Sequence, residues 1–342
     1  MARARAPLSS GPELHSSAIT DQWVSNVLKA HRGVKPQPAA RHTATSGTRG
    51  LCNGHTIAAV SIEHYENFPV ASWLCPPKLR PAVAAIYHFA RTADDLADEG
   101  DATPAQRSVD LQAYRQDLQR IVDGQTPSPR WAAAVFDPLA RCLNRYRLPP
   151  ALLNDLLDAF EQDLFKGNYT DRPELLDYCR RSANPVGRLL LHLYGVQDEL
   201  ALRRSDSICS SLQLINFWQD FSRDGPRGRV YAPHSDLSRH ALSTADLRDC
   251  RDSPAARALI ADLCAWAEQL MQEGAPLVHQ LPGRAGWELR LVVQGGLRIL
   301  EKIRAMHYAS LLQRPALTAL DAPLLLWRAS RMRQPNKPKE IL

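Results

Sequence analysis

Apolar residues recur at intervals of three and four positions along most of the chain from residue 63 onward, which places them on one face of an α-helix. Breaks interrupt the pattern at Pro76-Pro77, Asp123-Gly124, Pro149-Pro150 and Asp224-Gly225-Pro226. Runs that alternate Val, Ile, Thr or Tyr with polar residues, the signature of strands, are missing. The pattern predicts an all-α fold of roughly eight to ten helices in a single domain.

The two ends of the chain depart from this pattern. Residues 1–58 are rich in Arg, Ala, Ser, Pro and Gly, which predicts a basic, poorly packed extension. Residues 59–325 form the predicted domain, and residues 326–342 form a predicted tail. Pro323–Trp327 lies beside basic residues and could touch a membrane surface, although a last core helix is the simpler interpretation.

A first acidic segment, Ala84–Asp98, contains no helix breaker and is apolar enough to form a buried helix. Asp95 falls about 60° from Asp98 on the helical wheel, which suits a supporting or solvent-facing role better than metal binding. Four polar residues of the segment share one face within about 60°: Tyr87, Arg91, Asp94 and Asp98.

A second segment, Ser211–Asp224, carries a comparable polar stripe on a helix that is otherwise mostly large and apolar. Its polar residues fall within about 80° of one another: Gln213, Asn216, Asp220 and Asp224. This helix is therefore expected to carry its carboxylates into a mostly buried environment.

Carboxylates that lie close together in apolar surroundings repel each other, and burying them without a cation is costly. Mg²⁺ binds oxygen ligands and commonly combines one or two carboxylates with phosphate oxygens and waters. A solvated helix face is the simpler explanation for any single Asp pair. Two such pairs on apolar helices instead favour a site for Mg²⁺ and a diphosphate.

Charge and cysteine content narrow the class of partner. A formal charge of +6 and a pI near 9.0 suit nucleic acid, an anionic membrane or a polyanionic substrate. No basic run interleaved with aromatic residues and no zinc-finger signature is present, so no nucleic-acid partner is expected.

The seven scattered cysteines include no Cys-x-x-Cys pair and predict free thiols in a reducing cytoplasm. No apolar stretch approaches the roughly 18 residues of a membrane span.

Four motifs in this order resemble the squalene/phytoene synthase family, the head-to-head branch of the trans-isoprenyl diphosphate synthases. The similarity runs from about Glu63 to about Ala309. It implies an all-α, single-domain isoprenoid synthase fold with a central apolar cavity, and an enzyme that acts on prenyl diphosphates. The motifs are Asp94-Asp-Leu-Ala-Asp98, Asp177-Tyr-Cys-Arg-Arg-Ser-Ala-Asn-Pro-Val-Gly187, Gln213 to Asp224 and Gly228-Arg-Val-Tyr-Ala-Pro233.

Within that family, Glu66–Ser72, Phe89–Gly100 and Asn216–Asp220 look like the hydroxysqualene synthases of bacterial hopanoid pathways. That resemblance implies conversion of presqualene diphosphate and water into hydroxysqualene and diphosphate. Glu66-Asn67-Phe68 stands where squalene synthases usually carry Arg-Ser-Phe, and Gln219 stands where they usually carry Arg before the second Asp pair. We expect this loss of positive charge to reduce the number of diphosphate groups that the site can hold.

The resemblance also implies roles for individual residues. Asp94, Asp98, Asp220 and Asp224 are the expected ligands of two or three Mg²⁺ ions, with Arg91 and Arg229 binding the diphosphate. Tyr87, Tyr178 and Tyr231 are expected to contact the diphosphate or a carbocation, although core packing is the alternative for each. Asn67, Asn216 and Gln219 are candidate guides for water. The remaining candidates are expected to bind the substrate: Phe68, Ala183, Val186, Gly187, Leu190, Gln213 and Phe217.

Other members of the family remain alternatives, namely presqualene diphosphate synthase, squalene synthase and phytoene or dehydrosqualene synthase. Two non-enzymatic alternatives are an assembly factor that keeps this fold and a lipid-surface protein. We expect no use of NADPH. The resemblance favours a cytoplasmic protein, with peripheral contact to the inner membrane and to neighbouring squalene-pathway enzymes as an option.

Overall fold

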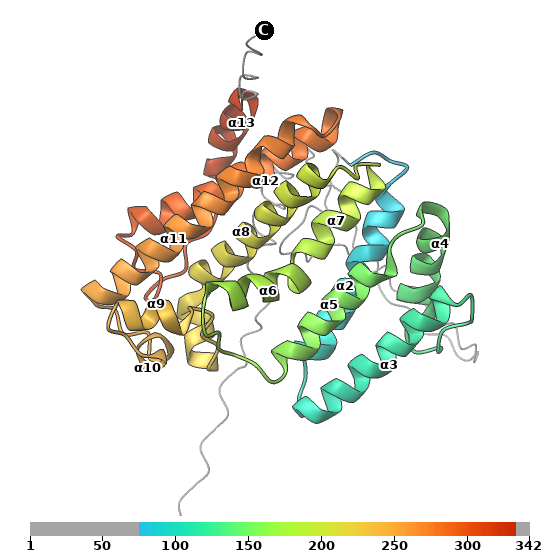
Figure 1. The fold of residues 1–342 in the computed structure, drawn as a ribbon, viewed down its shortest axis with the longest axis horizontal. Coiled ribbons are helices and arrows are strands. Elements are labelled where there is room, and N and C mark those ends of the chain that lie inside the picture. Colours follow the sequence, from blue (N-terminus) through green and yellow to red (C-terminus); the bar gives the residue numbers. More distant parts are fainter. Residues whose placement is uncertain (1–74, 333–342) are drawn as a thin grey trace, which may run out of the picture. The chain divides into compact units, whose positions relative to one another are not determined.

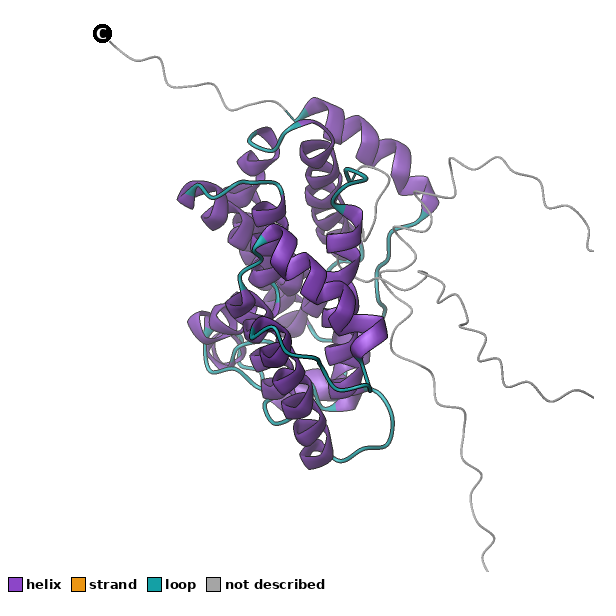
Figure 2. Cartoon of the chain, turned by 90° about the vertical axis from the view of Figure 1, so that its right-hand side faces the viewer, coloured by secondary structure: helices purple, strands orange, loops and turns teal. Residues whose placement is uncertain are grey.

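Every regular element that the computed structural model describes, within residues 75–332, is a helix (Figure 2). The predicted all-α fold is therefore confirmed. The predicted extension 1–58, Asn67 and Phe68 lie outside the described residues. The longer helices are α2 (Arg80–Asp98), α3 (Pro104–Val122), α5 (Pro150–Asp163), α8 (Glu199–Asp224), α11 (Pro254–Gly274) and α12 (Gly283–Ala305). The shorter ones are α4 (Asp137–Tyr146), α6 (Arg172–Ser182), α7 (Asn184–Leu193), α9 (His234–Arg239), α10 (Thr244–Arg248) and α13 (Ala322–Arg331).

The described part of the chain thus contains twelve α-helices, more than the eight to ten expected. The excess includes α9 and α10, which are only six and five residues long. A helix of little more than one turn has no repeated apolar spacing by which a sequence could reveal it. The last helix, α13, continues to Arg331, beyond the predicted domain boundary at residue 325.

Local signals explain where the helices around the site begin. The Asp198 side chain accepts a hydrogen bond from the Ala201 amide and caps α8. Asp171 caps α6 in the same way through the Glu174 amide. Pro185 occupies the first turn of α7, where its missing N–H leaves no helical hydrogen bond unmade.

The helices form two groups that α6 and α7 connect (Figure 1). In the first group, α2 packs against α3, α4 and α5. In the second group, α8 packs most extensively against α11 and also contacts α12. Because α6 and α7 contact both α5 and α8, they link the helix of the first acidic segment to the helix of the second.

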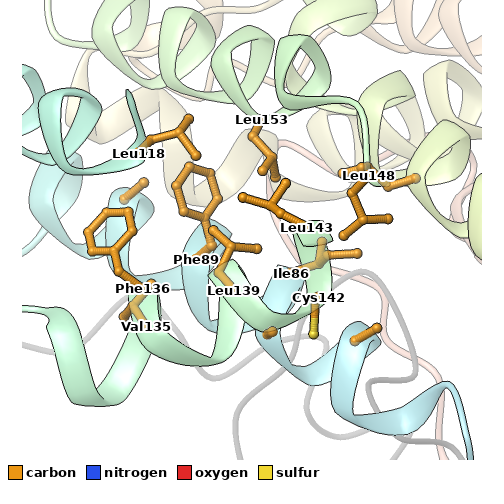
Figure 3. Close-up of a cluster of buried hydrophobic side chains, with 14 of the residues drawn as sticks. Ile86, Phe89, Leu118, Val135, Phe136, Leu139, Cys142, Leu143, Leu148 and Leu153 are labelled. Atoms are coloured by element: carbon orange, nitrogen blue, oxygen red, sulfur yellow. The ribbon is translucent and has the colours of Figure 1, made fainter. Parts of the chain in front are cut away.

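One apolar cluster holds α2 in place within the first group (Figure 3). Phe89 of α2 is fully buried among Tyr114, Phe136 and Leu139, and its ring lies 5.2 Å from that of Tyr114. The Tyr114 hydroxyl donates to the Phe89 carbonyl oxygen at 3.0 Å. Burial of large side chains of this kind stabilises a fold by roughly 1.5–3 kcal/mol each. The polar stripe of α2 is thus carried by a helix that is firmly fixed on its other side.

Candidate active site

The ends of the two acidic helices meet at Arg229. The Arg229 guanidinium group donates to the two carboxylate oxygens of Asp98, the last residue of α2, at 2.6 and 3.0 Å. The Arg229 amide donates to the carbonyl oxygen of Asp224, the last residue of α8, at 3.0 Å. Gly228 allows the chain to turn back toward the end of α8, since its φ of 79° is a conformation that favours glycine. The two acidic stripes therefore converge at one end of the molecule.

Asp224 lies in a buried environment with an excess of negative charge. Burial is the main cause that raises the pKa of Asp224, to about 7, and the charge of Asp220 acts in the same direction. Arg229 and Arg227 lower that pKa, while the Asp98 carboxylate raises it further. A carboxyl group held in this way would be stabilised as an anion by an additional cation.

Asp220 has a partner that the sequence did not reveal. The Arg314 guanidinium group, whose side chain is only 8% exposed, binds both carboxylate oxygens of Asp220. The next residue, Pro315, accepts a hydrogen bond at 2.7 Å from the Gln219 side chain, which is buried. Arg314 thus supplies positive charge at this end of α8, and the expected effect of Gln219 on the number of bound diphosphate groups stays a prediction. The Gln219 side chain is held by its hydrogen bond to a backbone oxygen, so Asn216 is the more exposed of the two described candidates for guiding water.

On α2, Arg91 forms ion pairs with three carboxylates at the C-terminal end of the helix. Its guanidinium nitrogens lie 3.1 Å from Asp94, 2.7 Å from Asp95 and 2.7 Å from Glu99. Burial raises the pKa of Asp95 to about 6, and the Arg91 charge opposes this shift. The supporting role expected of Asp95 stays a prediction, which its pairing with Arg91 favours. Tyr87, one turn before Arg91, is buried.

Aromatic side chains gather beside the point where the helices meet. The rings of Phe217 and Tyr231 are stacked, with centroids 3.8 Å apart and planes inclined by 7°. The Tyr178 ring lies 6.2 Å from Phe217 and 6.5 Å from Tyr231. Tyr169, which the sequence did not single out, lies 5.5 Å from Tyr178. We call these four residues, Tyr169, Tyr178, Phe217 and Tyr231, the aromatic cluster.

Asp163, the last residue of α5, is a second residue that the sequence analysis missed. Its Oδ2 accepts a hydrogen bond from the Tyr178 hydroxyl at 2.7 Å. Its Oδ1 is buried, and no donor within the described residues reaches it. Burial raises the pKa of Asp163 to about 7. Nothing in the local pattern of α5 distinguishes Asp163, because its partner belongs to another helix.

Gly187 has a packing role that the sequence analysis did not predict. A Cβ atom at this position would collide with Oγ of Ser205 and Sγ of Cys209, both on α8. Gly187 therefore allows close packing of α7 on α8, and its expected contact with the substrate stays a prediction. Ala183 is buried at the junction of α6 and α7, whereas Val186 and Leu190 are half-buried. Gln213 and Asn216 are also half-buried, on the same stripe of α8 as Asp220.

The donor set is suited to a metal ion that is shared with a phosphate group. Within residues 75–332, no three carboxylate, histidine or cysteine side chains are close enough to hold an ion by themselves. Asp98 and Asp224 come from two helices that Arg229 joins, and the anionic form of Asp224 is disfavoured by burial. These residues could hold Mg²⁺ that takes its remaining ligands from diphosphate oxygens and waters.

No helix in the described part of the chain is both long and apolar enough to cross a bilayer.

Residues 62–321 match the model of the squalene/phytoene synthase family. A hydroxysqualene synthase from Sinorhizobium fredii is 36% identical over 257 residues, which cover 75% of this chain and 84% of that protein. A phytoene synthase from Thermus thermophilus is 33% identical over 268 residues, which cover 78% of this chain and 88% of that protein.

Among solved structures, the squalene synthase HpnC from Alicyclobacillus acidocaldarius is 36% identical and superimposes with a TM-score of 0.65. The alignment covers 72% of this chain and 90% of that one. A dehydrosqualene synthase that is 22% identical has a TM-score of 0.63 and shares the fold. The isoprenoid synthase fold expected from the sequence is confirmed, and the chain belongs to the squalene/phytoene synthase family.

Proposed function

We propose that this chain is a hydroxysqualene synthase, which converts presqualene diphosphate and water into hydroxysqualene and diphosphate. Three relatives carry that name, at 36%, 34% and 33% identity. The observation that carries the proposal is the joining of Asp98 and Asp224 by Arg229 beside the aromatic cluster. This arrangement puts groups that bind a diphosphate next to groups that stabilise a cation.

Asp98 and Asp224 are the proposed metal ligands at the ends of α2 and α8, and Asp94 and Asp220 lie one turn earlier on the same stripes. When bound there, Mg²⁺ would offset the negative charge that develops on the departing diphosphate. Arg229 and Arg91 would donate charge-assisted hydrogen bonds to phosphate oxygens in exchange for their present carboxylate partners. Arg314 would be released from Asp220 in the same exchange.

The aromatic cluster would protect the carbocation that remains after the diphosphate has left. Ring faces attract cations, by up to about 2 kcal/mol when water is excluded. Tyr178 and Phe217 are buried, so bulk water does not reach these rings freely. Asn216, half-buried on the polar stripe of α8, is the more exposed described candidate for guiding the water that captures the cation.

The test is to incubate the purified protein with Mg²⁺ and either presqualene diphosphate or farnesyl diphosphate, without NADPH, and to identify the lipid by mass. Hydroxysqualene from presqualene diphosphate is the expected product. Presqualene diphosphate formed from farnesyl diphosphate would instead assign the chain to another activity of the family. Asp98→Asn is the matched inactive control, because it keeps the size of the side chain and removes its charge.

A further part of the proposal is peripheral contact with a lipid surface through α13. Leu326 and Trp327 are 41% and 53% exposed, and the Arg331 guanidinium carbon lies 4.7 Å from the centre of the Trp327 ring. Exposed Trp and Leu beside arginines suit the boundary of an anionic bilayer, where a thirty-carbon product would also dissolve. Trp327→Ser should weaken sedimentation with phosphatidylglycerol vesicles, and equal sedimentation of both proteins would refute this contact.

A further inference from the structure

Asp163 combines features that a purely structural residue rarely has. Its Oδ1 is buried without a donor among the described residues, although an unsatisfied polar atom costs about 1–3 kcal/mol. Within residues 75–332, its carboxyl group accepts a single hydrogen bond, from the Tyr178 hydroxyl at 2.7 Å. Unfavourable burial of a carboxyl group in a polar site is more typical of functional positions than of packing.

The surroundings of Asp163 contain both the proposed diphosphate site and the aromatic cluster. The charges of Asp98 and Arg229 act on Asp163 from the ends of α2 and α8, and Arg181 acts on it from α6. Asp163 in turn raises the pKa values of Tyr169 and Tyr231, after burial, which is the main cause in both. Tyr178 lies between the carboxyl group and the rings of Phe217 and Tyr231.

The proposed reaction benefits from a base in this position. When water attacks the substrate carbocation, a carbon–oxygen bond forms and the new hydroxyl group still carries an extra proton. Unless that proton is removed, the water can leave again or the cation can lose a proton from carbon and form an alkene. A base of the protein placed beside the cation would accept this proton directly and so favour the alcohol.

We propose that Asp163 is a positioning residue that enables Tyr178 to remove this proton. The Tyr178 oxygen accepts the proton from the attacking water while the Tyr178 hydroxyl proton passes to Oδ2 of Asp163. The products of the step are the neutral alcohol, an unchanged tyrosine and a neutral Asp163 carboxyl group. The carboxyl proton is then returned to the diphosphate or to solvent as the products leave. This inference rests on the proposed function.

The pKa of Asp163, about 7, fits such a role because a base works best when its pKa is near the ambient pH. The carboxyl group is ionised above that pH and accepts the proton, and it is already protonated below that pH. The hydroxysqualene share of the products from the unmodified protein should therefore fall as the pH is lowered through about 7.

The experiment is a single turnover of presqualene diphosphate with Mg²⁺, in which released diphosphate and each lipid product are measured from pH 5.5 to pH 8.5. Asp163→Asn and Tyr178→Phe should each lower the hydroxysqualene share, per diphosphate released, by about tenfold or more. Each should also abolish the pH dependence of that share. The double variant should be no worse than either single variant, because the two residues act as one unit.

Asp155→Asn is the matched control, because Asp155 is also on α5 and burial also raises its pKa. The proposal is overturned if Asp163→Asn keeps the parental product share and pH profile, or if the effects of Asp163→Asn and Tyr178→Phe simply add. Should Asp163→Asn fail to fold, a product share of the unmodified protein that does not change with pH overturns it equally. If the unmodified protein makes no hydroxysqualene at any pH, the proposed function itself fails and this inference fails with it.

Discussion

Arg229 binds Asp98 through two hydrogen bonds of 2.6 and 3.0 Å, although 131 positions separate the two residues in the sequence. The same arginine is anchored to the end of α8 by its backbone amide, which donates to the Asp224 carbonyl oxygen. A planar guanidinium group that binds both carboxylate oxygens fixes orientation as well as distance. Arg229 therefore links the C-terminal ends of the two acidic helices, where it can also reach a diphosphate.

Arg229→Lys should lower kcat/KM for presqualene diphosphate by about 100-fold, and it should raise the Mg²⁺ concentration needed for half-maximal rate. An ammonium group keeps the charge but cannot bind two oxygens in a fixed plane, and loss of one preorganised charge contact typically costs about 10²–10³ in rate. Steady-state kinetics over a range of Mg²⁺ concentrations provide the measurement. The control is Arg203→Lys, in an exposed pair with Glu199 on α8, and equal losses in the two variants would contradict the assigned role.

Mg²⁺ together with inorganic pyrophosphate should raise the Tm of the protein, whereas either one alone should have a smaller effect. A ligand that binds only the native state stabilises it by about 2.7 kcal/mol at a concentration 100 times its Kd. Asp224→Asn should remove most of this shift, since the proposed site would lose the charge of one carboxylate ligand. Thermal unfolding with and without the ligands is the measurement. A full shift in Asp224→Asn would exclude Asp224 as a ligand.

Both acidic helices could be predicted from the sequence because helical periodicity is a local property. The first was expected over Ala84–Asp98 and is observed over Arg80–Asp98, and the second ends at Asp224 as expected. Motif order was enough to indicate the family, and with it the fold. The predicted central cavity stays a prediction.

The contacts that complete the site could not be predicted in the same way. Arg314 lies 94 positions from Asp220, and Asp163 lies in a helix that carries no motif. Each is defined by a partner on another element, and one sequence contains no signal that pairs them. The packing role of Gly187 was missed for a related reason, because a small residue in a helix suits a close helix neighbour as well as a substrate.

Gly187→Ala should destabilise the protein by about 1–3 kcal/mol, because the added methyl group would overlap two side chains of α8 in a close-packed interface. Urea unfolding measures the change. Gly167→Ala is the control, since a Cβ atom there would meet only a backbone oxygen, at an ordinary distance of 3.7 Å. Adding Cys209→Ala to Gly187→Ala should restore part of the loss. If Gly187→Ala is as stable as the control, α7 does not pack on α8 as described.

Asp163→Asn should stabilise the protein at pH 8, and by a smaller amount at pH 5. Because burial raises the pKa of Asp163 from 3.8 to about 7, the native state holds a proton on this carboxyl group that the unfolded state has released between these values. The stability that comes from the neutral group is present below the unfolded pKa and is lost as the pH rises through about 7. An asparagine cannot ionise, so Asp163→Asn should avoid that loss. Its free energy of unfolding at pH 8 should exceed that of the parent by roughly 1–3 kcal/mol.

Urea unfolding of both proteins at pH 5 and pH 8 measures the difference. Asp177→Asn provides a control of opposite sign, because hydrogen bonds from Arg180 and Arg181 lower the pKa of Asp177. Its carboxylate stabilises the native state above the unfolded pKa, so replacing it should bring no gain at pH 8. If Asp163→Asn is no more stable than the parent at pH 8, the carboxyl group is better solvated or better paired than its buried Oδ1 indicates. A gain in stability accompanied by a loss of hydroxysqualene would show that the chain keeps Asp163 for its chemistry at the expense of its fold.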